Sequence, residues 1–292
     1  MNSGQVVLIT GASSGFGRLI AETAARKGYR VFATMRSIGG RNSSAAGELA
    51  DLARRESLWL RALELDVTSE GSVEQAVGKA VGECGRIDVL VNNAGYALMG
   101  VTEAVTLEQA ARIMDTNFLG AVRMNRAVLP YMRKQRSGLL VHVSSGAGRV
   151  VVPSMAFYCA SKWALEALAE EYRYQLASQG IDSVIIQPGA YPTAVFRNIE
   201  RAADASRTDT YGRVNRIADE VLSRLAESKA DPQEIADVVL KTIETPIGQR
   251  QLRQRVGGGI NGIVELNQLS LGVQQQLLEG LGMAEIARFA AG

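Results

Sequence analysis

The sequence predicts an α/β fold built on a doubly wound parallel sheet. Short runs rich in Val, Ile and Leu alternate with longer amphipathic segments along the first two thirds of the 292 residues. The short runs are apolar throughout, which is typical of strands that helices cover on both faces. Glycine is over-represented, with 30 residues against a background of about 7%, and one glycine cluster directly follows the first apolar run.

The composition excludes several classes of protein. Hydrophobic residues make up 47% and charged residues 21%, proportions that exclude collagen-like and disordered chains. The formal net charge of +2 offers no basic surface for a nucleic acid. No apolar run reaches the roughly 18 residues of a membrane span, and Cys84 and Cys159 form neither a disulfide framework nor a metal-ligand pair. We therefore expect a cytoplasmic protein without a metal or a nucleic-acid partner.

The first strand, helix and strand show the pattern most clearly. Val6–Thr10 is apolar and β-branched, which predicts a strand. Phe16–Lys27 places apolar residues at the spacing of one helix face, and Gly28 stands where a helix C-cap belongs. Tyr29–Thr34 is the next predicted strand.

The rest of the regular part repeats this alternation. No linker rich in Pro or Ser divides it, so we predict one domain over residues 1–257, with a substrate loop or lid at 193–230. Inside that loop, the polar segment Arg197–Arg216 predicts a mobile surface loop, and residues 258–292 predict an appended helical extension. The further elements expected are helix Ala45–Arg55, strand Trp59–Leu65, helix Ser72–Glu83, strand Ile87–Val91, helices Leu107–Asn117 and Leu119–Lys134, strand Leu139–Val143, helix Phe157–Ser178 and strand Ile181–Ile186.

The glycine turn after the first strand is a candidate phosphate site. Its spacing, G-x-x-x-G-x-G, matches neither the usual dinucleotide pattern nor a Walker loop. The physics is the same, because glycines allow tight turns and let a pyrophosphate approach the free N–H groups of a helix N-terminus. A tight turn with no ligand is the alternative. The residues of this candidate site are Gly11, Ser13, Ser14, Gly15, Phe16 and Gly17.

The same turn also fits the nucleophile elbow of serine hydrolases. Gly11–Gly15 reads G-x-S-x-G between a strand and a helix. That chemistry needs a histidine that can reach Ser13, and the single histidine, His142, lies inside a predicted strand. The hydrolase is therefore the weaker interpretation.

The second and third strands indicate the coenzyme. Arg36 follows the second strand, where an acid would bind the ribose of NAD and an arginine suits the 2′-phosphate of NADP. We therefore expect NADP(H), with NAD(H) still possible, although a lone arginine is also often a solvated surface charge. Asp66 and Val67 after the third strand are candidates for adenine contacts, and Asp66 is equally suited to cap the next helix.

Together, these motifs resemble the short-chain dehydrogenase/reductase family. The resemblance runs over Val6–Thr193 and is nearest to the 17β-hydroxysteroid and retinol dehydrogenase branch. It implies a Rossmann-type fold, a dinucleotide coenzyme and a homodimer or homotetramer. The residues that carry it are Thr10–Gly17, Asn92–Gly95, Asn117, Ser145 and the pair Tyr158-x-x-x-Lys162.

The tyrosine and lysine explain the implied chemistry. Tyr158 and Lys162 are four residues apart on a predicted helix, so they share a face. A nearby ammonium, together with the positive charge of an oxidised nicotinamide, should depress the pKa of the phenol. The phenol can then exchange a proton with a substrate oxygen during hydride transfer. Ser145, at the end of a strand, can donate a hydrogen bond to that oxygen.

Other roles come from the resemblance alone. It implies that Asn117 holds a water near Lys162, although a buried amide satisfied by the backbone is the alternative. It also places Asn93, Ala94 and Gly95 beside the coenzyme ribose, and Pro188, Gly189 and Thr193 at the nicotinamide amide.

We therefore expect an NADP(H)-dependent oxidoreductase that interconverts a secondary alcohol and a ketone or aldehyde. Tyr96, Leu98 and Tyr191 are candidate substrate walls, and their largely apolar character favours a hydrophobic small molecule. A 3-oxoacyl-type reductase and a dinucleotide sensor without turnover are the alternatives.

Overall fold

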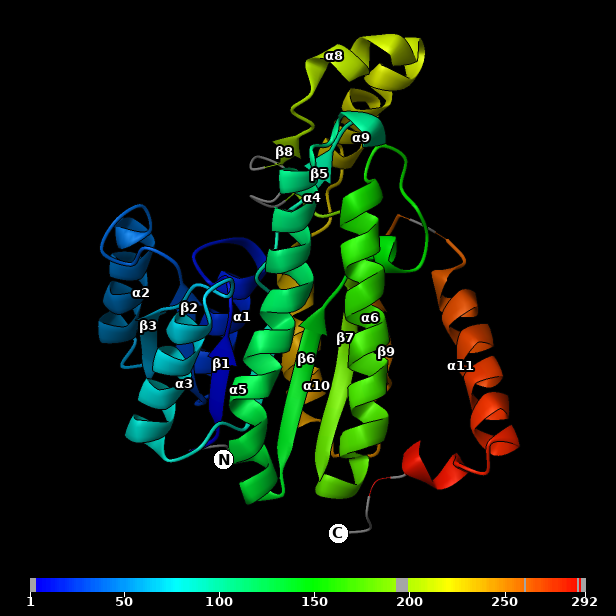
Figure 1. The fold of residues 1–292 in the computed structure, drawn as a ribbon. Helices are drawn as coiled ribbons and strands as arrows, with labels where there is room; N and C mark the ends of the chain where they lie inside the picture. The colour runs from blue at the N-terminus through cyan, green and yellow to red at the C-terminus, as the bar shows by residue number, and fades with distance from the viewer. Residues whose placement is uncertain (1–3, 193–198, 260, 288, 290–292) are drawn as a thin grey trace.

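A parallel sheet of seven strands forms the centre of the molecule. The computed structural model describes residues 4–192, 199–259, 261–287 and 289 (Figure 1). The strand order is β3-β2-β1-β4-β6-β7-β9 and every neighbouring pair is parallel, which confirms the predicted doubly wound sheet. The strands are β1 (Val6–Ile9), β2 (Arg30–Met35), β3 (Leu60–Glu64), β4 (Val89–Asn92), β6 (Gly138–Val143), β7 (Ile181–Pro188) and β9 (Arg253–Val256).

Helices cover both faces of this sheet, as Figure 1 shows. In β1, Val7 and Ile9 pack into one core cluster, whereas Val6 and Leu8 pack into the other. Both sets of side chains are buried, which is why the strand sequences are apolar throughout rather than alternating. One layer contains α1 (Gly15–Arg26), α2 (Ser43–Arg55) and α10 (Gln233–Glu244), and the other contains α3 (Glu70–Cys84), α5 (Gly120–Gln135) and α6 (Ala156–Leu176).

The chain direction places the site. The order of the sheet reverses between β1 and β4, because β2 and β3 lie on one side of β1 whereas β6, β7 and β9 lie beyond β4. Ligands of such sheets bind beyond the carboxyl ends of the strands at this switch point. The turns that follow β1 and β4 are therefore the ones that meet there.

Helix α10 and strand β9 are among the elements that the sequence analysis did not predict. Helix α10 packs on α1, and β9 adds the seventh strand beside β7. The β9 sequence, Arg-Gln-Arg-Val, has no apolar run because it forms the sheet edge. Its Arg253 is paired with Glu166 and Glu170 instead of packing against apolar groups.

The expected mobile loop at Arg197–Arg216 is wrong for the part that the structure describes. From residue 200 onward the segment forms strand β8 (Glu200–Arg201), helix α8 (Ala205–Thr208) and the 3₁₀ helix η5 (Asp209–Arg216). β8 pairs in parallel with β5 (Leu98–Met99) as a separate two-stranded sheet. The polar composition suggests a loop, but several of its charged side chains pair with residues outside the segment: Glu200 with Arg112, Arg201 with Asp219, and Arg207 with Glu103.

The C-terminal segment contains helix α11 (Ile263–Gly280) and the 3₁₀ helix η6 (Ala284–Ala287). Figure 1 shows α11 beyond the edge strand β9. We retain the domain division after residue 257 as a proposal, since β9 ends at Val256. Within the described part of the chain, none of the helices combines the length and hydropathy that crossing a bilayer requires.

Candidate active site

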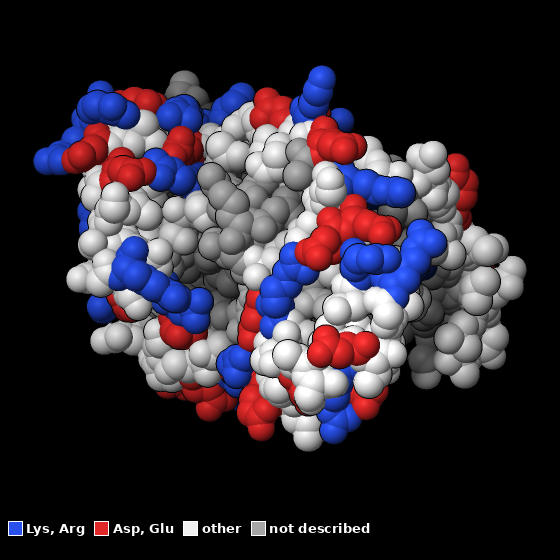
Figure 2. Space-filling view, turned by 90° about the horizontal axis from the view of Figure 1, so that it is seen from above, with Lys and Arg blue, Asp and Glu red and all other residues white. Residues whose placement is uncertain are grey.

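Two adjoining cavities open at the carboxyl ends of the strands. Seen from above, the surface is hollowed between charged side chains (Figure 2). The first cavity, of about 790 Å³, runs along the ends of β1, β2, β3 and β4, and we call it the groove. The second, of about 240 Å³, lies beside β6 and β7, and we call it the inner chamber. Both are lined by Phe16, Asn93, Gly95 and Tyr96, so the groove leads into the chamber.

The glycine turn forms one wall of the groove. Gly11 and Gly15 have φ angles of +66° and +57°, which residues with side chains rarely adopt. A Cβ on Gly17 would overlap Asn93 and the Gly11 carbonyl oxygen, so Gly17 is needed for close packing behind the turn. Unlike the rest of the motif, Gly17 is not among the described residues that line the groove.

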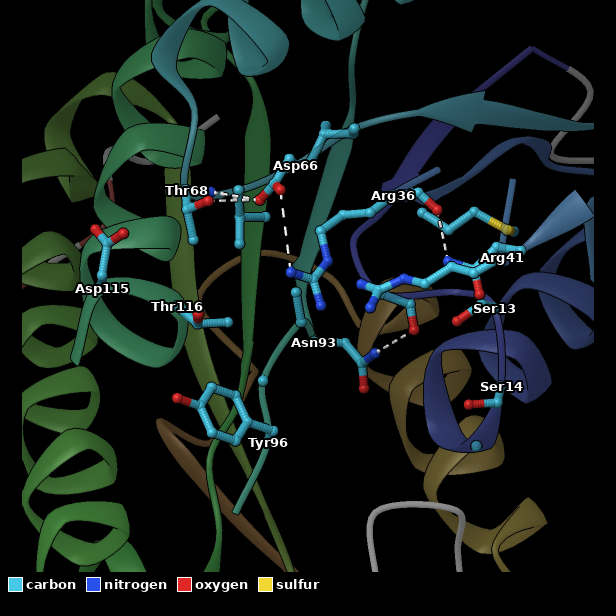
Figure 3. Close-up of a pocket in the computed structure, with 18 of the residues that line it drawn as sticks. Ser13, Ser14, Arg36, Arg41, Asp66, Thr68, Asn93, Tyr96, Asp115 and Thr116 are labelled. Carbon is cyan, nitrogen blue, oxygen red and sulfur yellow. Dashed lines mark hydrogen bonds and ion pairs between the residues drawn. The ribbon is translucent and has the colours of Figure 1, made fainter. Parts of the chain in front are cut away.

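The start of α1 is suited to an anion. Its N-cap residue, Ser14, makes no side-chain capping hydrogen bond, so the first N–H groups of the helix remain available. Ser13 and Ser14 line the groove, and Figure 3 shows both at its glycine-turn end. The turn is held to the end of β4, because Asn93 Nδ2 donates to the carbonyl oxygens of Thr10 (2.9 Å) and Gly11 (3.1 Å).

Two arginines that follow β2 line the groove (Figure 3). Arg36 Nη1 lies 4.0 Å from Asp66 Oδ2, and Arg41 is the second. The sequence analysis did not single out Arg41, although a second cation five residues after Arg36 was a usable signal. Glu64 shapes the loop between them, since its carboxylate accepts from the N–H groups of Ser37 and Ile38, both at 2.7 Å.

The two candidates after β3 both line the groove. Asp66 Oδ1 accepts from the N–H (3.0 Å) and the hydroxyl (2.7 Å) of Thr68, so it shapes this turn. It does not cap α3, because that N-cap is Ser69. Val67 packs closely against Gly120, where a Cβ would lie only 2.8 Å from a Val67 methyl.

The phenol, the ammonium and the hydroxyl line the inner chamber together. Tyr158 and Lys162 come from α6, and Ser145 follows the end of β6. Lys162 Nζ lies 5.8 Å from the centroid of the Tyr158 ring and donates to the Val143 carbonyl oxygen at 2.9 Å. Ser145 Oγ accepts from the Ala147 N–H at 3.1 Å, which leaves its own proton free for another acceptor.

Burial shifts the pKa values of both members of this pair. Burial raises the pKa of Tyr158, and a hydrogen bond with Ser145 opposes that shift only in part. Burial also lowers the pKa of Lys162 to about 8, against the attraction of Glu166. The depressed phenol pKa that is expected beside an oxidised nicotinamide stays a prediction. Tyr158 thus holds its proton at neutral pH.

Asn117 lies in a one-turn π-helix (Asp115–Leu119) between α4 (Leu107–Met114) and α5. Its Nδ2 donates to the Tyr96 carbonyl oxygen (2.9 Å) and to Ser161 Oγ (3.1 Å), and its Oδ1 accepts from the Tyr96 N–H (3.0 Å). Protein groups therefore satisfy the amide, in agreement with the alternative interpretation. The water-holding role remains a prediction.

The candidate substrate walls divide into two kinds. Tyr96 and Tyr191 line the chamber, and Tyr191 is fixed by a hydrogen bond from its hydroxyl to Glu234 Oε2 at 2.8 Å. Leu98 is not among the described residues that line either cavity. It is buried in β5, directly after Ala97, which does line the chamber. Pro188 and Gly189 line the chamber, whereas Thr193 lies outside the described residues.

The hydrolase interpretation finds no support in this arrangement. His142 is fully buried in β6, and burial lowers its pKa to about 3. Its Nδ1 lies 3.4 Å from Asn92 Nδ2. Among the described residues, no hydrogen bond connects it to Ser13, which faces the groove instead.

Glu166 is a buried residue that the sequence analysis missed. It lies one helical turn after Lys162, and that spacing was the available signal. Its Oε1 accepts from Ser144 Oγ (2.9 Å) and Gln187 Nε2 (2.7 Å), and its Oε2 accepts from Arg253 Nε (2.8 Å). One carboxylate thus joins β6, β7 and β9 beneath the chamber.

We expect Glu166→Gln to move the alkaline limb of a pH–activity profile to lower pH. Loss of the carboxylate lowers the pKa of Lys162 further, so the ammonium loses its proton earlier as pH rises. The free energy of unfolding should fall by about 3 kcal/mol, because buried Arg253 loses a partner. Steady-state rates between pH 6 and 10 and urea unfolding measure the two effects.

Glu170→Gln is the matched control. Glu170 also pairs with Arg253, at 2.5 Å, but it has no contact with Ser144 or Gln187 among the recorded hydrogen bonds of the described residues. Its alkaline limb should stay at the pH of the unchanged protein. Equal shifts in both variants would mean that Arg253, rather than the carboxylate beside Lys162, controls the profile.

The chain is similar to known proteins over most of its length. The family model for short chain dehydrogenases matches residues 5–204. A 3-ketodihydrosphingosine reductase of Bacteroides thetaiotaomicron is 40% identical over 194 residues. The match covers 66% of this chain and 66% of that protein, just under two thirds of each. Estradiol 17-beta-dehydrogenase 1 of Rattus norvegicus is 35% identical over 82% of this chain and 71% of its own length.

Solved structures share the whole fold. A short-chain dehydrogenase from Streptomyces avermitilis superposes with a TM-score of 0.77 at 29% identity, covering 97% of this chain and 98% of that one. A short chain dehydrogenase/reductase from Burkholderia phymatum in complex with NAD has a TM-score of 0.77 at 25% identity, over 94% and 96%. A single-substitution variant of actinorhodin polyketide ketoreductase with NADPH has a TM-score of 0.73 at 27% identity, over 88% and 97%.

Proposed function

Because the chain belongs to the short-chain dehydrogenase family, an oxidoreductase family, we propose that it is an NADP(H)-dependent enzyme that interconverts a hydrophobic secondary alcohol and a ketone or aldehyde. One observation carries this proposal. Tyr158, Lys162 and Ser145 line a chamber that opens into the groove beside the glycine turn. A dinucleotide seated in the groove therefore brings one end to these three side chains.

The described residues fit such a coenzyme. The turn at Gly11 and Gly15 and the uncapped start of α1 would hold the pyrophosphate. Arg36 and Arg41 would bind the 2′-phosphate of NADP, whereas NAD has no group there for them. Asp66 and Val67 would contact adenine, Asn93, Ala94 and Gly95 the ribose, and Pro188, Gly189 and Thr193 the nicotinamide amide.

The coenzyme, when bound, supplies or accepts the hydride. The protein's own groups handle the proton. Tyr158 holds its phenolic proton at neutral pH, because burial raises its pKa. In the reducing direction, Tyr158 donates this proton to the carbonyl oxygen of the substrate. Ser145 donates a hydrogen bond to the same oxygen, and Lys162 stabilises the phenolate that forms. Oxidation reverses these steps and needs the phenolate first.

Apolar groups favour a hydrophobic substrate. Ala97, Val152 and Met155 line the chamber together with the polar catalytic groups. The names of two relatives agree with this, since 3-ketodihydrosphingosine is a long-chain ketone and estradiol is a steroid alcohol. We expect a ketone whose bulk is apolar.

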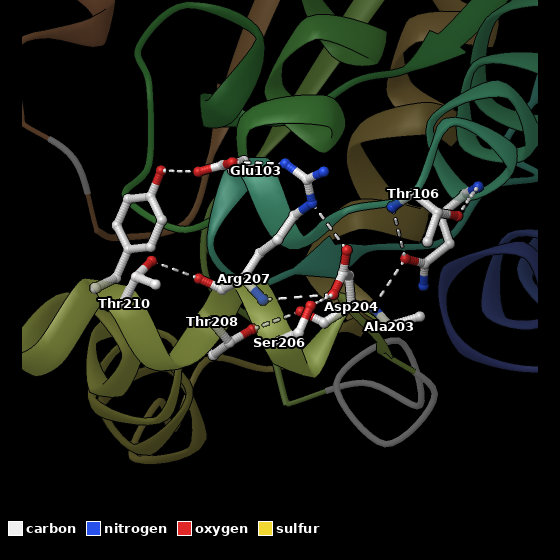
Figure 4. A network of polar contacts seen from close by, with 10 residues as sticks. Glu103, Thr106, Ala203, Asp204, Ser206, Arg207, Thr208 and Thr210 are labelled. Atoms are coloured by element: carbon white, nitrogen blue, oxygen red, sulfur yellow. Dashed lines mark hydrogen bonds and ion pairs between the residues drawn. The ribbon is translucent and has the colours of Figure 1, made fainter.

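A 3-oxoacyl-type reductase is the second candidate, and the likeness to a polyketide ketoreductase favours it. An acidic carrier protein would need an unpaired basic surface near the mouth. Arg207 is instead paired with Glu103 and Asp204 (Figure 4), and Arg201 is paired with Asp219. This pairing neutralises two of the arginines near the mouth, whereas Arg213 and Arg216 are exposed and form no recorded ion pair within the described part of the chain, so the acyl-carrier substrate stays open.

A turnover screen tests the proposal. We expect NADPH oxidation with hydrophobic ketones and a lower kcat/KM with NADH. The second candidate function is tested by comparing kcat/KM for a 3-oxoacyl thioester of a carrier protein with kcat/KM for the same thioester of a small thiol. A 3-oxoacyl-type reductase requires a clear preference for the carrier-protein thioester. Coenzyme binding without turnover of any carbonyl compound would instead indicate a dinucleotide sensor.

We also propose a cytoplasmic homodimer or homotetramer. Helices α5 and α6 expose Tyr131 and Trp163, apolar groups suited to an interface between copies. The free thiols of Cys84 and Cys159 fit a reducing compartment. Sedimentation velocity measures the assembly state.

A further inference from the structure

The inner chamber contains positive charge that its lining does not neutralise. Among the described residues that line it, Lys162 and Arg255 are the charged ones, and none is an acid. Lys162 has a partial counter-charge in buried Glu166. Arg255, at the end of β9, has no role in the chemistry proposed above.

Within the described ranges, every recorded hydrogen bond of the Arg255 guanidinium goes to a backbone carbonyl oxygen. Its Nη1 donates to the carbonyl oxygens of Gln187 (3.2 Å) and Val256, and its Nη2 donates to that of Gly258 (2.6 Å). Its Nε is buried and has no hydrogen-bond partner. These bonds join the ends of β7 and β9, but they do not cancel the charge.

No carboxylate in the described part of the chain forms an ion pair with Arg255. The nearby acids are used elsewhere: Glu166 pairs with Arg253, and Glu234 accepts the hydroxyl of Tyr191. The pKa directions agree with this, because burial lowers the pKa of Arg255 whereas carboxylates raise that of Arg253. Arg255 nevertheless stays protonated, as arginine does in proteins.

Arg255 lines the chamber and packs closely behind Gly189. A Cβ on Gly189 would lie 2.8 Å from Arg255 Nη2 and would overlap the Gly258 carbonyl oxygen. The absence of a side chain at Gly189 therefore lets the cation approach the chamber. In a poorly solvated site, a charge at such a distance is weakly screened.

The groove and the chamber share their lining, so a dinucleotide that occupies the groove extends its nicotinamide into the chamber beside Tyr158. This step rests on the proposed function. The nicotinamide ring carries a positive charge when oxidised and none when reduced. A fixed cation behind Gly189 therefore raises the free energy of the oxidised form relative to the reduced form.

We propose that Arg255 makes the chamber selective for the reduced coenzyme, which it binds more tightly than the oxidised form. The charge acts on the nicotinamide end of the coenzyme from the chamber lining, and Arg255 takes no part in the proton transfer proposed for Tyr158. Arg255 is therefore a residue that determines specificity between the two redox forms. The effect should be the same for NADP(H) and NAD(H), because the adenosine end does not change between the oxidised and reduced forms of either coenzyme.

The test is the ratio of two dissociation constants, Kd for NADP⁺ over Kd for NADPH, measured by titration calorimetry without substrate. We expect the native protein to bind NADPH more tightly and Arg255→Gln to lower the ratio by about tenfold. Arg255→Lys is the matched control, because it loses most of the carbonyl contacts but keeps the charge and should keep most of the ratio. Arg255→Met is a second neutral variant if the glutamine variant does not fold.

An unchanged ratio in a folded neutral variant would overturn the inference, and so would a parallel rise of both dissociation constants. Equal loss of the ratio in Arg255→Lys would show that the contacts matter rather than the charge, and would overturn it too. These results leave the proposed function intact. Absence of binding of any nicotinamide dinucleotide to the native chain would refute the proposed function itself, and the inference with it.

Discussion

Tyr158→Phe is expected to lower kcat for a hydrophobic ketone by about 1,000-fold and to leave the Kd for NADPH within about twofold. The change removes the phenolic oxygen but keeps the ring in its place on α6. The loss of kcat is expected because Tyr158 is the group in the chamber that supplies the proton. Burial keeps the proton on Tyr158 at neutral pH, whereas the Lys162 ammonium donates to the Val143 carbonyl.

Stopped-flow measurement of NADPH oxidation separates the chemical step from product release, and fluorescence titration gives the Kd. Tyr174→Phe is the matched control, since Tyr174 lies on the same helix and donates its hydroxyl to Glu170 at 2.6 Å. It should lose little activity. Near-normal turnover in Tyr158→Phe would show that the proton comes from another group or from water.

Arg36→Asp should lower the ratio of kcat/KM with NADPH to kcat/KM with NADH by about 1,000-fold. The 2′-phosphate carries nearly two negative charges, so the change replaces a charge-assisted donor with a repelling carboxylate. The variant also frees Asp66, which faces Arg36 at 4.0 Å, and this adds a second negative charge at the same end of the groove. A carboxylate at this position can in addition accept from the ribose hydroxyls of NADH.

Steady-state kinetics with both coenzymes at several salt concentrations measure this effect. Arg55→Asp, on the exposed end of α2, makes the same change in net charge away from the groove and should leave the ratio unchanged. Arg41→Ala measures the share of the second arginine. Unaltered discrimination in Arg36→Asp would mean that the 2′-phosphate is bound elsewhere.

The sequence predicted most of the parallel sheet, because a run of apolar residues within a single short segment is enough to identify a buried strand. Each strand from β1 to β7 in the main sheet, except the edge strand β3, is a largely apolar run, since helices bury both faces. The missed β9 is an edge strand whose Arg253 finds its partners 83 and 87 residues away on α6. The same holds for residues 200–216, where contacts to Glu103 and Gln109 give a polar segment its structure.

The sequence by itself determined the chemistry that depends on spacing along the chain: the glycine turn at the start of α1, the pair Tyr158 and Lys162 one helical turn apart, and Arg36 at the end of β2. Only the tertiary structure decided what depends on burial and on distant partners. It showed the raised pKa of the phenol, the carboxylate of Glu166 beneath the chamber and the unpaired charge of Arg255 behind Gly189. The reason is physical, because desolvation and charge balance arise from every group packed around a site, and the groups around this one come from strands and helices far apart in the chain.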